Sequence, residues 1–104
     1  MDIYNLESNL EFEWDGGNST KNYSKHGVTS SEIEECFFNF TLVSPDIIHS
    51  QYEERFNLLG ETDSEKTLFV SFTVRFLKIR VISARSADKK EKQMYETIKN
   101  NSKI

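Results

Sequence analysis

Apolar and polar residues alternate along residues 10–14, which is the pattern of a half-buried β-strand. Asp15 follows this strand and can accept hydrogen bonds from the first free N–H groups of a helix, so a first helix is expected to start there. The helix should end at Gly27, because glycine readily takes the left-handed conformation that closes a helix. Residues 29–32, Thr-Ser-Ser-Glu, have the spacing of a capping box and predict a second helix. Its apolar stripe consists of Ile33, Cys36, Phe37 and Phe40.

From residue 51 the apolar period changes to two, which predicts strands at 51–59, 67–74 and 78–84. A polar turn is expected at 60–66 and a tight connection at 75–77. Ile79 and Val81 are expected to face the core from the last strand. A final helix should begin at Ser86 or Asp88 and carries Tyr95 on its apolar side. The predicted fold class is α+β, with two N-terminal helices, an antiparallel sheet of three to four strands and a C-terminal helix packed against the sheet.

The length of 104 residues is that of one domain, residues 1–104, and is sufficient for a hydrophobic core. One cysteine excludes an intramolecular disulfide, and one cysteine with two histidines makes a structural zinc site a poor interpretation. The first residues lack the pattern of a signal peptide, and no apolar run approaches the length that spans a membrane. We therefore expect a soluble, cytoplasmic protein.

Charge is distributed very unevenly along the chain. Residues 1–65 carry three basic residues against fourteen acidic ones, whereas residues 66–104 carry ten basic residues against three acidic ones. A chain with this asymmetry can present a positive face to phosphate although its net charge is −4. The alternative is that an acidic half simply docks on a basic half.

Two arginines, Arg80 and Arg85, lie within the predicted strand 78–84 and directly after it. Arginine is almost never buried without a partner, so each needs an anion. That anion is either a carboxylate of this protein or a phosphate of a ligand.

Two further constellations carry possible chemistry. Lys25 and His26 fall in the last turn of the first helix, where the helix dipole favours cations and a histidine can serve as acid or base. They can equally be ordinary residues of a helix end. Glu53 and Arg55 share one strand face and are expected near Arg80, which would suit cleavage of a phosphodiester. The alternative here is a cross-strand ladder of salt bridges on a solvent-facing sheet.

The remaining candidates are weaker. His49 lies in a polar loop and is expected at the surface, and Cys36 lies on an apolar stripe and is expected in the core. Tyr95 is expected to pack, although on a basic helix it could stack on a nucleic-acid base. The lysines at 89, 90 and 92 are most simply a solvated helix face. No glycine-rich phosphate loop and no metal-carboxylate motif occurs in the sequence.

Several motifs, in their order and spacing, resemble those of the BrnT family. They are Glu13-Trp14-Asp15, residues 22–28 (Asn-Tyr-Ser-Lys-His-Gly-Val), residues 53–56 (Glu-Glu-Arg-Phe), residues 80–85 (Arg-Val-Ile-Ser-Ala-Arg), and finally Glu91 and Tyr95. The resemblance extends over about residues 12–96. It implies a ribonuclease toxin of a bacterial type II toxin–antitoxin module, with a fold similar to the RelE and ParE toxins. It further implies RNA cleavage without a metal or cofactor, neutralised by a BrnA-type antitoxin whose ribbon-helix-helix part binds DNA.

The resemblance also implies site residues, and it implies a toxin–antitoxin heterotetramer. The catalytic candidates are Lys25, His26, Glu53, Arg55, Arg80 and Arg85, and the RNA-binding candidates are Lys78, Lys89, Lys90 and Tyr95. Three positions depart from the family pattern. Gly16 stands where a proline is usual, Asn18 replaces a lysine, and Phe76-Leu77 replaces the usual glycine or aspartate of a hairpin.

The main hypothesis is a metal-independent endoribonuclease toxin. Arg55, Arg80 and Arg85 would hold the scissile phosphate, and Glu53 or His26 would take the proton of the ribose 2′-OH, with Lys25 assisting electrostatically. The alternative is a non-catalytic interaction module, or a decayed toxin, whose basic C-terminal half docks an acidic partner.

Overall fold

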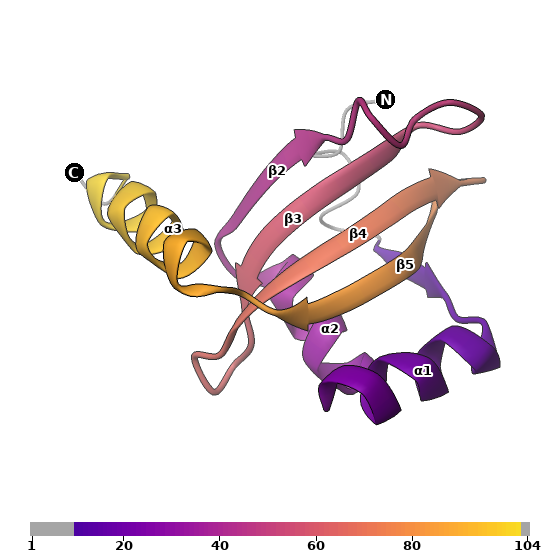
Figure 1. Cartoon of the computed structure of the whole chain (residues 1–104), viewed down its shortest axis with the longest axis horizontal. Coiled ribbons are helices and arrows are strands. Elements are labelled where there is room, and N and C mark those ends of the chain that lie inside the picture. The colour runs from indigo at the N-terminus through magenta and orange to yellow at the C-terminus, as the bar shows by residue number, and fades with distance from the viewer. Residues whose placement is uncertain (1–9, 103–104) are drawn as a thin grey trace.

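A five-stranded sheet forms the centre of the computed structural model, which describes residues 10–102, without the side chains of residues 18–20 (Figure 1). The order across the sheet is β1-β5-β4-β3-β2. The strands are β1 (Glu11–Glu13), β2 (Thr41–Pro45), β3 (Arg55–Glu61), β4 (Thr67–Arg75) and β5 (Lys78–Ser86). The helices are α1 (Gly16–His26), α2 (Ser30–Phe38) and α3 (Lys89–Asn101).

The predicted α+β class is confirmed, but the sheet differs from the prediction in two ways. It has five strands rather than three or four, and it is mixed, because β1 pairs with β5 in parallel while the other neighbours are antiparallel. The strand that was missed is β2, an edge strand that ends at Pro45. Proline lacks an N–H and is tolerated at a sheet edge, so it closes this strand and does not exclude it.

Helix ends fall where local capping chemistry predicts them. Asp15 accepts a hydrogen bond from the N–H of Gly17, and Thr29 and Glu32 form a capping box. Gly27 closes α1 in the left-handed conformation, with φ of 66°. Asp88, one of the two predicted starts, caps α3 together with Glu91.

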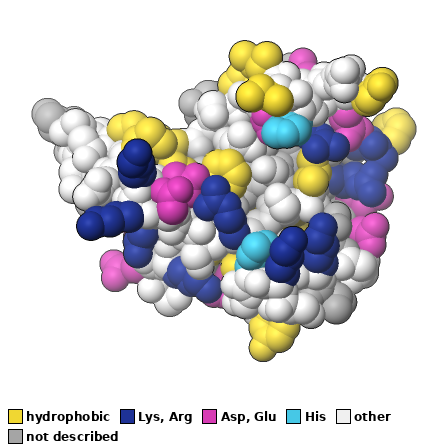
Figure 2. Space-filling model, in the orientation of Figure 1, with side chains coloured by type: hydrophobic (Ala, Val, Ile, Leu, Met, Phe, Trp, Pro, Cys, Tyr) yellow, Lys and Arg dark blue, Asp and Glu magenta, His cyan; other side chains and the backbone are white. Residues whose placement is uncertain are grey.

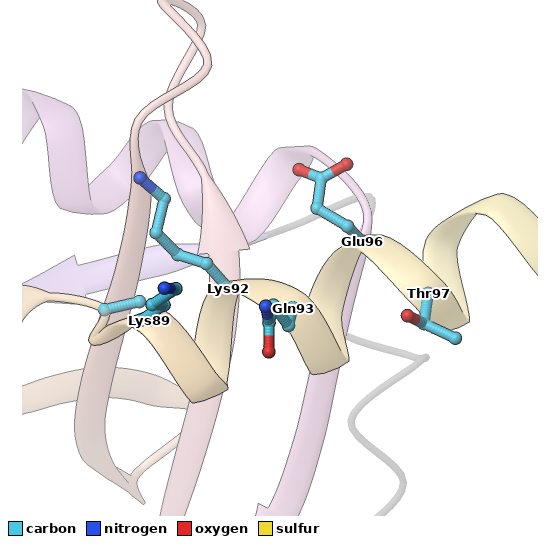
Figure 3. Close-up of a pocket in the computed structure, with 6 residues that line it drawn as sticks. Lys89, Lys92, Gln93, Glu96 and Thr97 are labelled. Atoms are coloured by element: carbon cyan, nitrogen blue, oxygen red, sulfur yellow. The ribbon is translucent and has the colours of Figure 1, made fainter.

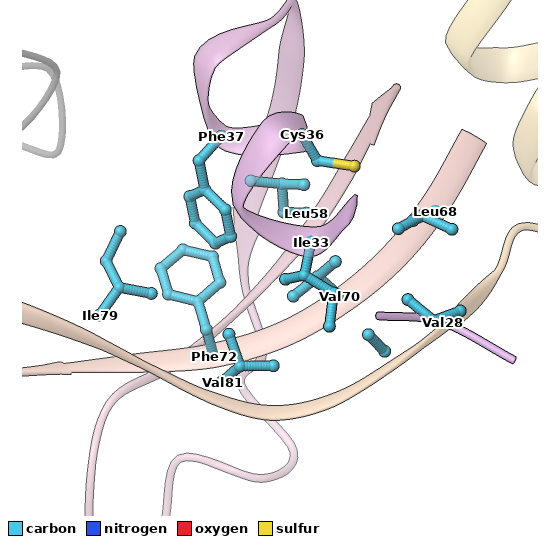
Figure 4. Packing of buried hydrophobic residues seen from close by; sticks show 11 residues of the cluster. Val28, Ile33, Cys36, Phe37, Leu58, Leu68, Val70, Phe72, Ile79 and Val81 are labelled. Carbon is cyan, nitrogen blue, oxygen red and sulfur yellow. The ribbon is translucent and has the colours of Figure 1, made fainter. Parts of the chain in front are cut away.

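The hydrophobic core lies on one face of the sheet, between the strands and α2. Alternate residues of β3, β4 and the first half of β5 point toward this helix, as the period of two predicts. A bulge at Ile82 shifts the alternation in β5, so the next buried residue after Val81 is Ala84. Figure 4 shows their side chains meeting those of α2. The buried cluster comprises Val28, Ile33, Cys36, Phe37, Leu58, Leu68, Val70, Phe72, Ile79, Val81 and Ala84. Burial raises the pKa of the Cys36 thiol to about 12, so Cys36 is a core residue, as expected.

No helix within residues 10–102 covers the opposite face of the sheet, and we call it the open face. In Figure 1, α2 lies behind the strands and α3 projects away from the end of β5. The prediction that α3 packs against the sheet is therefore wrong for most of its length. It is anchored by Tyr95, which is fully buried and donates a hydrogen bond of 2.6 Å to the carbonyl of Phe40, and by an ion pair between Lys99 and Glu61. No helix in the described part of the chain is long and apolar enough to cross a membrane.

The hairpin between β4 and β5 has two bulky residues at its turn. Phe76 and Leu77 have φ of 52° and 64°, which is the left-handed region that Asn-Gly usually occupies in such turns. Both side chains are exposed, Phe76 by 90%. Because no packing compensates for the strained backbone, this turn costs stability.

Gly60 marks another correction, because it lies inside β3 rather than at the start of the predicted polar turn. A Cβ at this position would meet the Cβ and the carbonyl oxygen of Cys36, each at 3.0 Å. Its missing side chain therefore allows α2 to approach β3 closely.

We expect Gly60→Ala to lower the free energy of unfolding by about 1–3 kcal/mol, since one of the two close atoms belongs to helix backbone. Gly16→Ala is the matched control. Nothing lies within 4 Å of its added Cβ, so this change should be neutral or stabilising by about 0.5 kcal/mol. Urea unfolding of both variants tests this; equal stabilities would contradict the close approach.

Candidate functional site

A row of polar and charged side chains crosses the open face near the hairpin. Arg55 of β3 pairs with Thr73 of β4, Thr73 pairs with Arg80 of β5, and Arg80 pairs with Glu13 of β1. We call Arg55, Thr73 and Arg80 the arginine row. Adjacent strands are about 4.8 Å apart, so the two arginine backbones lie about 10 Å apart, and both long side chains can reach one phosphate between them.

Neither arginine side chain of this row forms an ion pair with the residues that the structure describes. Arg80 and Arg55 do act electrostatically on the carboxylate of Glu53. Thr73 is buried, and its hydroxyl donates a hydrogen bond of 2.7 Å to the carbonyl of Glu54. That bond ties the loop between β2 and β3 to the centre of the row.

Glu53 lies at the hairpin side of the row, where it pairs with Arg75. The Arg75 Nη2 is 2.5 Å and its Nε 3.2 Å from Glu53 Oε2. The hydrogen bond from Arg75, followed by the charges of Arg80 and Arg55, holds the pKa of the Glu53 carboxyl below its usual range. Glu53 is thus an ionised carboxylate surrounded by three arginines. The prediction that Glu53, Arg55 and Arg80 come together agrees with this arrangement.

The opposite side of the row is also polar. Asn57 and Ser71 face each other on neighbouring strands, and the Ser71 hydroxyl donates to Asn57 Oδ1 at 2.9 Å. Asp46, the first residue of the β2–β3 loop, interacts with the Asn57 side chain through its carboxylate. The same carboxylate lies 2.9 Å from Nδ1 of His49. Burial raises the pKa of Asp46, but its hydrogen bonds with His49 outweigh this effect, and the pKa lies below its usual range.

Arg85 lies away from the arginine row, at the other end of β5. It is five residues beyond Arg80, roughly 16 Å along a strand. Both carboxylate oxygens of Glu91 accept hydrogen bonds from its guanidinium, at 2.8 and 3.0 Å. The central carbon of the guanidinium lies 4.4 Å from the centre of the Phe69 ring. The anion that Arg85 requires is thus internal, and the expectation that it joins Arg55 and Arg80 at one phosphate does not agree with the structure.

Lys25 and His26 lie beside the second half of β5, not beside Glu53. Asn22 of α1 is bound to β5, because its Oδ1 accepts a hydrogen bond of 3.3 Å from the N–H of Ala84. Lys25 and His26 come three and four residues later, about one helical turn further along α1. Figure 1 shows α1 lying along this strand. Both side chains are exposed. The structure therefore does not bring them to the carboxylate with which they were predicted to act.

The RNA-binding candidates divide in the same way. Lys78 is exposed at the start of β5, next to the arginine row, whereas Lys89 and Lys90 are exposed in the first turn of α3. Tyr95 has no exposed surface, and a buried ring cannot stack on a base. Tyr95 is therefore corrected from an RNA-binding residue to a packing residue.

An open hollow of about 860 Å³ lies along α3, and Figure 3 shows its lining side chains. Its lining residues are Ala87, Lys89, Lys92, Gln93, Glu96 and Thr97. It shares only Lys89 with the predicted site and includes none of the catalytic candidates. We therefore place the candidate site at the arginine row, not in this hollow.

Figure 2 shows the charge pattern of the open face. Lysine and arginine side chains gather at the hairpin end of the sheet, on the right of the view, and again around the junction of β5 and α3 on the left. Both histidines of the chain are visible on this face. Within residues 10–102, no group of three or more His, Cys, Asp or Glu side chains is placed to hold a metal ion.

Sequence reasoning missed five residues of this site. Arg75 was assigned to a connection, and Glu13 and Thr73 reach the arginines only through strand register. His49 was expected in a surface loop, and its partner Asp46 was not considered. The spacing Asp46-x-x-His49 was the one local signal that was available.

We expect Glu91→Gln to lower stability at neutral pH by about 1 kcal/mol, since glutamine can still cap α3 but cannot pair with Arg85. The hydrogen bond from Arg85 lowers the pKa of Glu91 in the folded state. Its stabilisation is therefore complete at neutral pH and is lost as the pH falls from about 4.3 through the lowered pKa. Urea unfolding from pH 7 to pH 3 should show a weaker pH dependence in the variant, and parallel curves would contradict the pairing.

Comparison with known proteins agrees with this architecture. The family model of the ribonuclease toxin BrnT of type II toxin–antitoxin systems matches residues 14–91. A search of curated proteins found no match. The crystal structure of the Brucella abortus ribonuclease toxin BrnT is similar in fold, with a TM-score of 0.55 and 23% identity over 77% of this chain and 99% of that chain. Because the family model matches most of its length, this chain belongs to the BrnT family of ribonuclease toxins of type II toxin–antitoxin systems.

Proposed function

We propose that this chain is a metal-independent endoribonuclease toxin of a single domain, that it acts on RNA in the cytoplasm, and that its catalytic centre is the arginine row with Glu53. The observation that carries this proposal is the pair of arginines, Arg55 and Arg80, that face solvent across Thr73 without an ion-pair partner among the described residues. A stable fold gains little from two arginines on one face without ion-pair partners, and an RNA phosphate is the anion that suits them.

Arg55 and Arg80 bind the scissile phosphate and stabilise the additional negative charge of its pentavalent transition state. Groups positioned in advance for developing charge typically contribute about 10²–10³ in rate each. Arg75 fixes the Glu53 side chain by its two hydrogen bonds to Oε2. Glu53 takes the proton of the ribose 2′-OH, because it is an ionised carboxylate next to both phosphate-binding arginines.

Metal independence follows from the choice of nucleophile. The 2′-oxygen of the RNA attacks the adjacent phosphorus, so that no activated water is required in the cleavage step. The arginines supply the positive charge that a metal ion supplies in other nucleases. The products are a 2′,3′-cyclic phosphate and a free 5′-hydroxyl.

The other basic candidates serve the flanking RNA in this proposal. Lys78 lies next to the arginine row, and Lys89 and Lys90 lie at the end of β5. Lys89 and Lys90 also occupy the first turn of α3, where the helix dipole disfavours cations. Their positive charges therefore do not serve to stabilise the helix. Lys25 and His26 border the same track along β5 and contact RNA outside the reacting phosphate, whereas Arg85 keeps its internal partner Glu91.

The family pairs its toxins with an antitoxin. We assign a BrnA-type antitoxin to this chain, with a ribbon-helix-helix part that binds DNA and with two copies of each protein in the complex. Exposed apolar side chains near the site support a protein partner. They are Ile47, Ile48 and Tyr52 in the β2–β3 loop and Phe76 and Leu77 in the β4–β5 turn. A partner that covers this end of the sheet blocks the arginine row.

Replacing Arg80 with alanine is expected to reduce RNA cleavage roughly 100-fold or more, because the phosphate loses one of its two arginines. The fold should be unaffected, since the Arg80 side chain makes no hydrogen bond or ion pair with described residues. Single-turnover cleavage of a labelled RNA by antitoxin-free protein in EDTA measures this effect.

Lys21→Ala is the control, because it removes the same charge from an exposed position of α1. Equal cleavage by wild type and Arg80→Ala would exclude Arg80 from the site. Wild-type cleavage that requires a divalent ion would contradict metal independence, and absence of cleavage by folded protein would favour a non-catalytic interaction module.

We also expect the toxin and the protein of an adjacent ribbon-helix-helix reading frame to purify together as a heterotetramer. Leu77→Asp should weaken this complex at least tenfold, because it places a charge in an apolar contact. Light scattering and calorimetry measure stoichiometry and affinity. A complex of unchanged affinity would show that the partner binds elsewhere.

A further inference from the structure

The loop between β2 and β3 carries a histidine, His49, that the proposed mechanism does not use. Asp46 holds it by two contacts, one between Asp46 Oδ1 and the backbone N–H of His49 at 3.3 Å and one between Asp46 Oδ2 and His49 Nδ1 at 2.9 Å. An imidazole bound at Nδ1 by a carboxylate has its orientation fixed and its Nε2 left for another partner. The side chain is 63% exposed, so Nε2 is accessible.

The hydrogen-bond network beneath the pair places it on the open face. Phe56 and Leu58 of β3 point into the core, so Asn57 between them points to the open face. The Asn57 side chain accepts from Ser71 and interacts with the Asp46 carboxylate. Ser71, Asn57, Asp46 and His49 thus form a continuous polar chain. A surface contact between residues three apart in a loop would not require this connection to the sheet.

The loop is also fixed relative to Arg55. The N–H of Asp46 donates to the Arg55 carbonyl at 2.8 Å, and the N–H of Arg55 donates to the Ser50 hydroxyl at 3.0 Å. That hydroxyl in turn donates to the Asp46 carbonyl at 2.6 Å. His49 directly precedes Ser50, so its backbone is held beside one of the two phosphate-binding arginines.

Along the strand direction, the arginine row lies between two proton-transfer groups. Arg75 and Glu53 are on the hairpin side of Thr73, and Ser71 and Asn57, with Asp46 and His49 above them, are on the other side. Two residues along a strand correspond to about 6.6 Å, so Arg75 on one side and the Asn57–Ser71 pair on the other each lie one step from the row, where they contact Glu53 and Asp46. Displacement at phosphorus proceeds in line, with the attacking and leaving oxygens on opposite sides, and it therefore needs a base and an acid on opposite sides.

We infer that His49, oriented by Asp46, is the general acid of the ribonuclease site and protonates the leaving 5′-oxygen opposite Glu53. The inference rests on the proposed function, because it assigns a further catalytic residue to the same arginine row. Glu53 cannot fill this role, since it is ionised before it accepts the 2′-proton. His26 does not compete for it, because it lies beside the second half of β5.

The step balances without a further reactant. The 2′-oxygen forms a bond to phosphorus as its proton moves to Glu53, and the bond from phosphorus to the 5′-oxygen breaks as that oxygen takes the proton from Nε2 of His49. Glu53 is left protonated and His49 neutral, and both return to their starting forms by proton exchange with water. Asp46 occupies Nδ1 of His49, so the proton that is transferred comes from Nε2.

The test compares an ordinary RNA with one that carries a 5′-bridging sulfur at the cleaved bond. A thiolate leaves without protonation, so a missing general acid affects only the ordinary RNA. His49→Gln should slow cleavage of the ordinary RNA roughly 100-fold or more and cleavage of the sulfur-substituted RNA less than about fivefold. Asp46→Asn should show the same selectivity with a smaller loss. Gln51→Ala, a change at an exposed residue of the same loop, is the control for disturbance of the loop.

The possible outcomes distinguish the acid role of His49 from the proposed ribonuclease function. Equal losses on both substrates, or no loss on either, would overturn the acid role of His49 while leaving the ribonuclease function intact. If folded wild-type protein cleaves neither RNA, the proposed function fails, and the acid role fails with it. Circular dichroism and urea unfolding establish that each variant is folded.

Discussion

Alternation along β5 is the constraint on which the rest of this structure depends. Ile79 and Val81 are fully or almost fully buried against α2, so their neighbour Arg80 has to point to the other face of the sheet. The same alternation makes Arg55 of β3 and Thr73 of β4 point to the open face, because the residues next to them in each strand pack toward the core. A register shift of one residue would bury these arginines and expose the core, which is why one covered face specifies the register firmly. The open face and its positive charge are therefore a direct consequence of how the core is built.

The same geometry resolves the question raised by the asymmetric charge. Part of the basic half is neutralised by the acidic half, because Lys66, Arg75 and Lys99 pair with Glu32, Glu53 and Glu61. Arg85 finds its anion within the basic half, at Glu91. Arg55 and Arg80 have no ion-pair partner within residues 10–102, and they lie on either side of Thr73 on the same face. Internal ion pairs thus neutralise part of the basic half, and Arg55 and Arg80 are left available for an external anion.

Local chemistry made much of the fold predictable. The capping box of α2, the closing glycine of α1 and the inward-facing Ile79 and Val81 of β5 depend on residues close together in sequence, and all were predicted. For α3 the start at Asp88 was one of two predicted, but its capping box with Glu91 was not. The edge strand β2 was missed because it is short, partly exposed and ends in proline. The placement of α3 was wrong because amphipathic spacing shows that a helix has an apolar side but does not show what covers it.

The candidate site shows the same limit more sharply. Glu53, Arg55 and Arg80 were expected to be close because they were assigned to one face of neighbouring strands. In the structure Glu53 lies in the loop just before β3, and the charges of Arg55 and Arg80 still act on its carboxylate. Arg85 is separated from them simply because five residues of extended chain span too far. The parallel pairing that brings Glu13 beside Arg80, and the contact of the Asp46 loop with Asn57, arise from tertiary structure alone. No pattern within the sequence reveals them.

The central claim is that an RNA phosphate binds to Arg55 and Arg80 on the open face. The most direct test is to follow the Nε–Hε signals of the arginines by NMR while a single-stranded RNA with a 2′-deoxy residue at the cleavage position is added. The account predicts large shifts for Arg55 and Arg80 and little change for Arg85, which Glu91 already holds. Shifts confined to Arg85, with Arg55 and Arg80 unchanged, would contradict it and place RNA at the junction of β5 and α3.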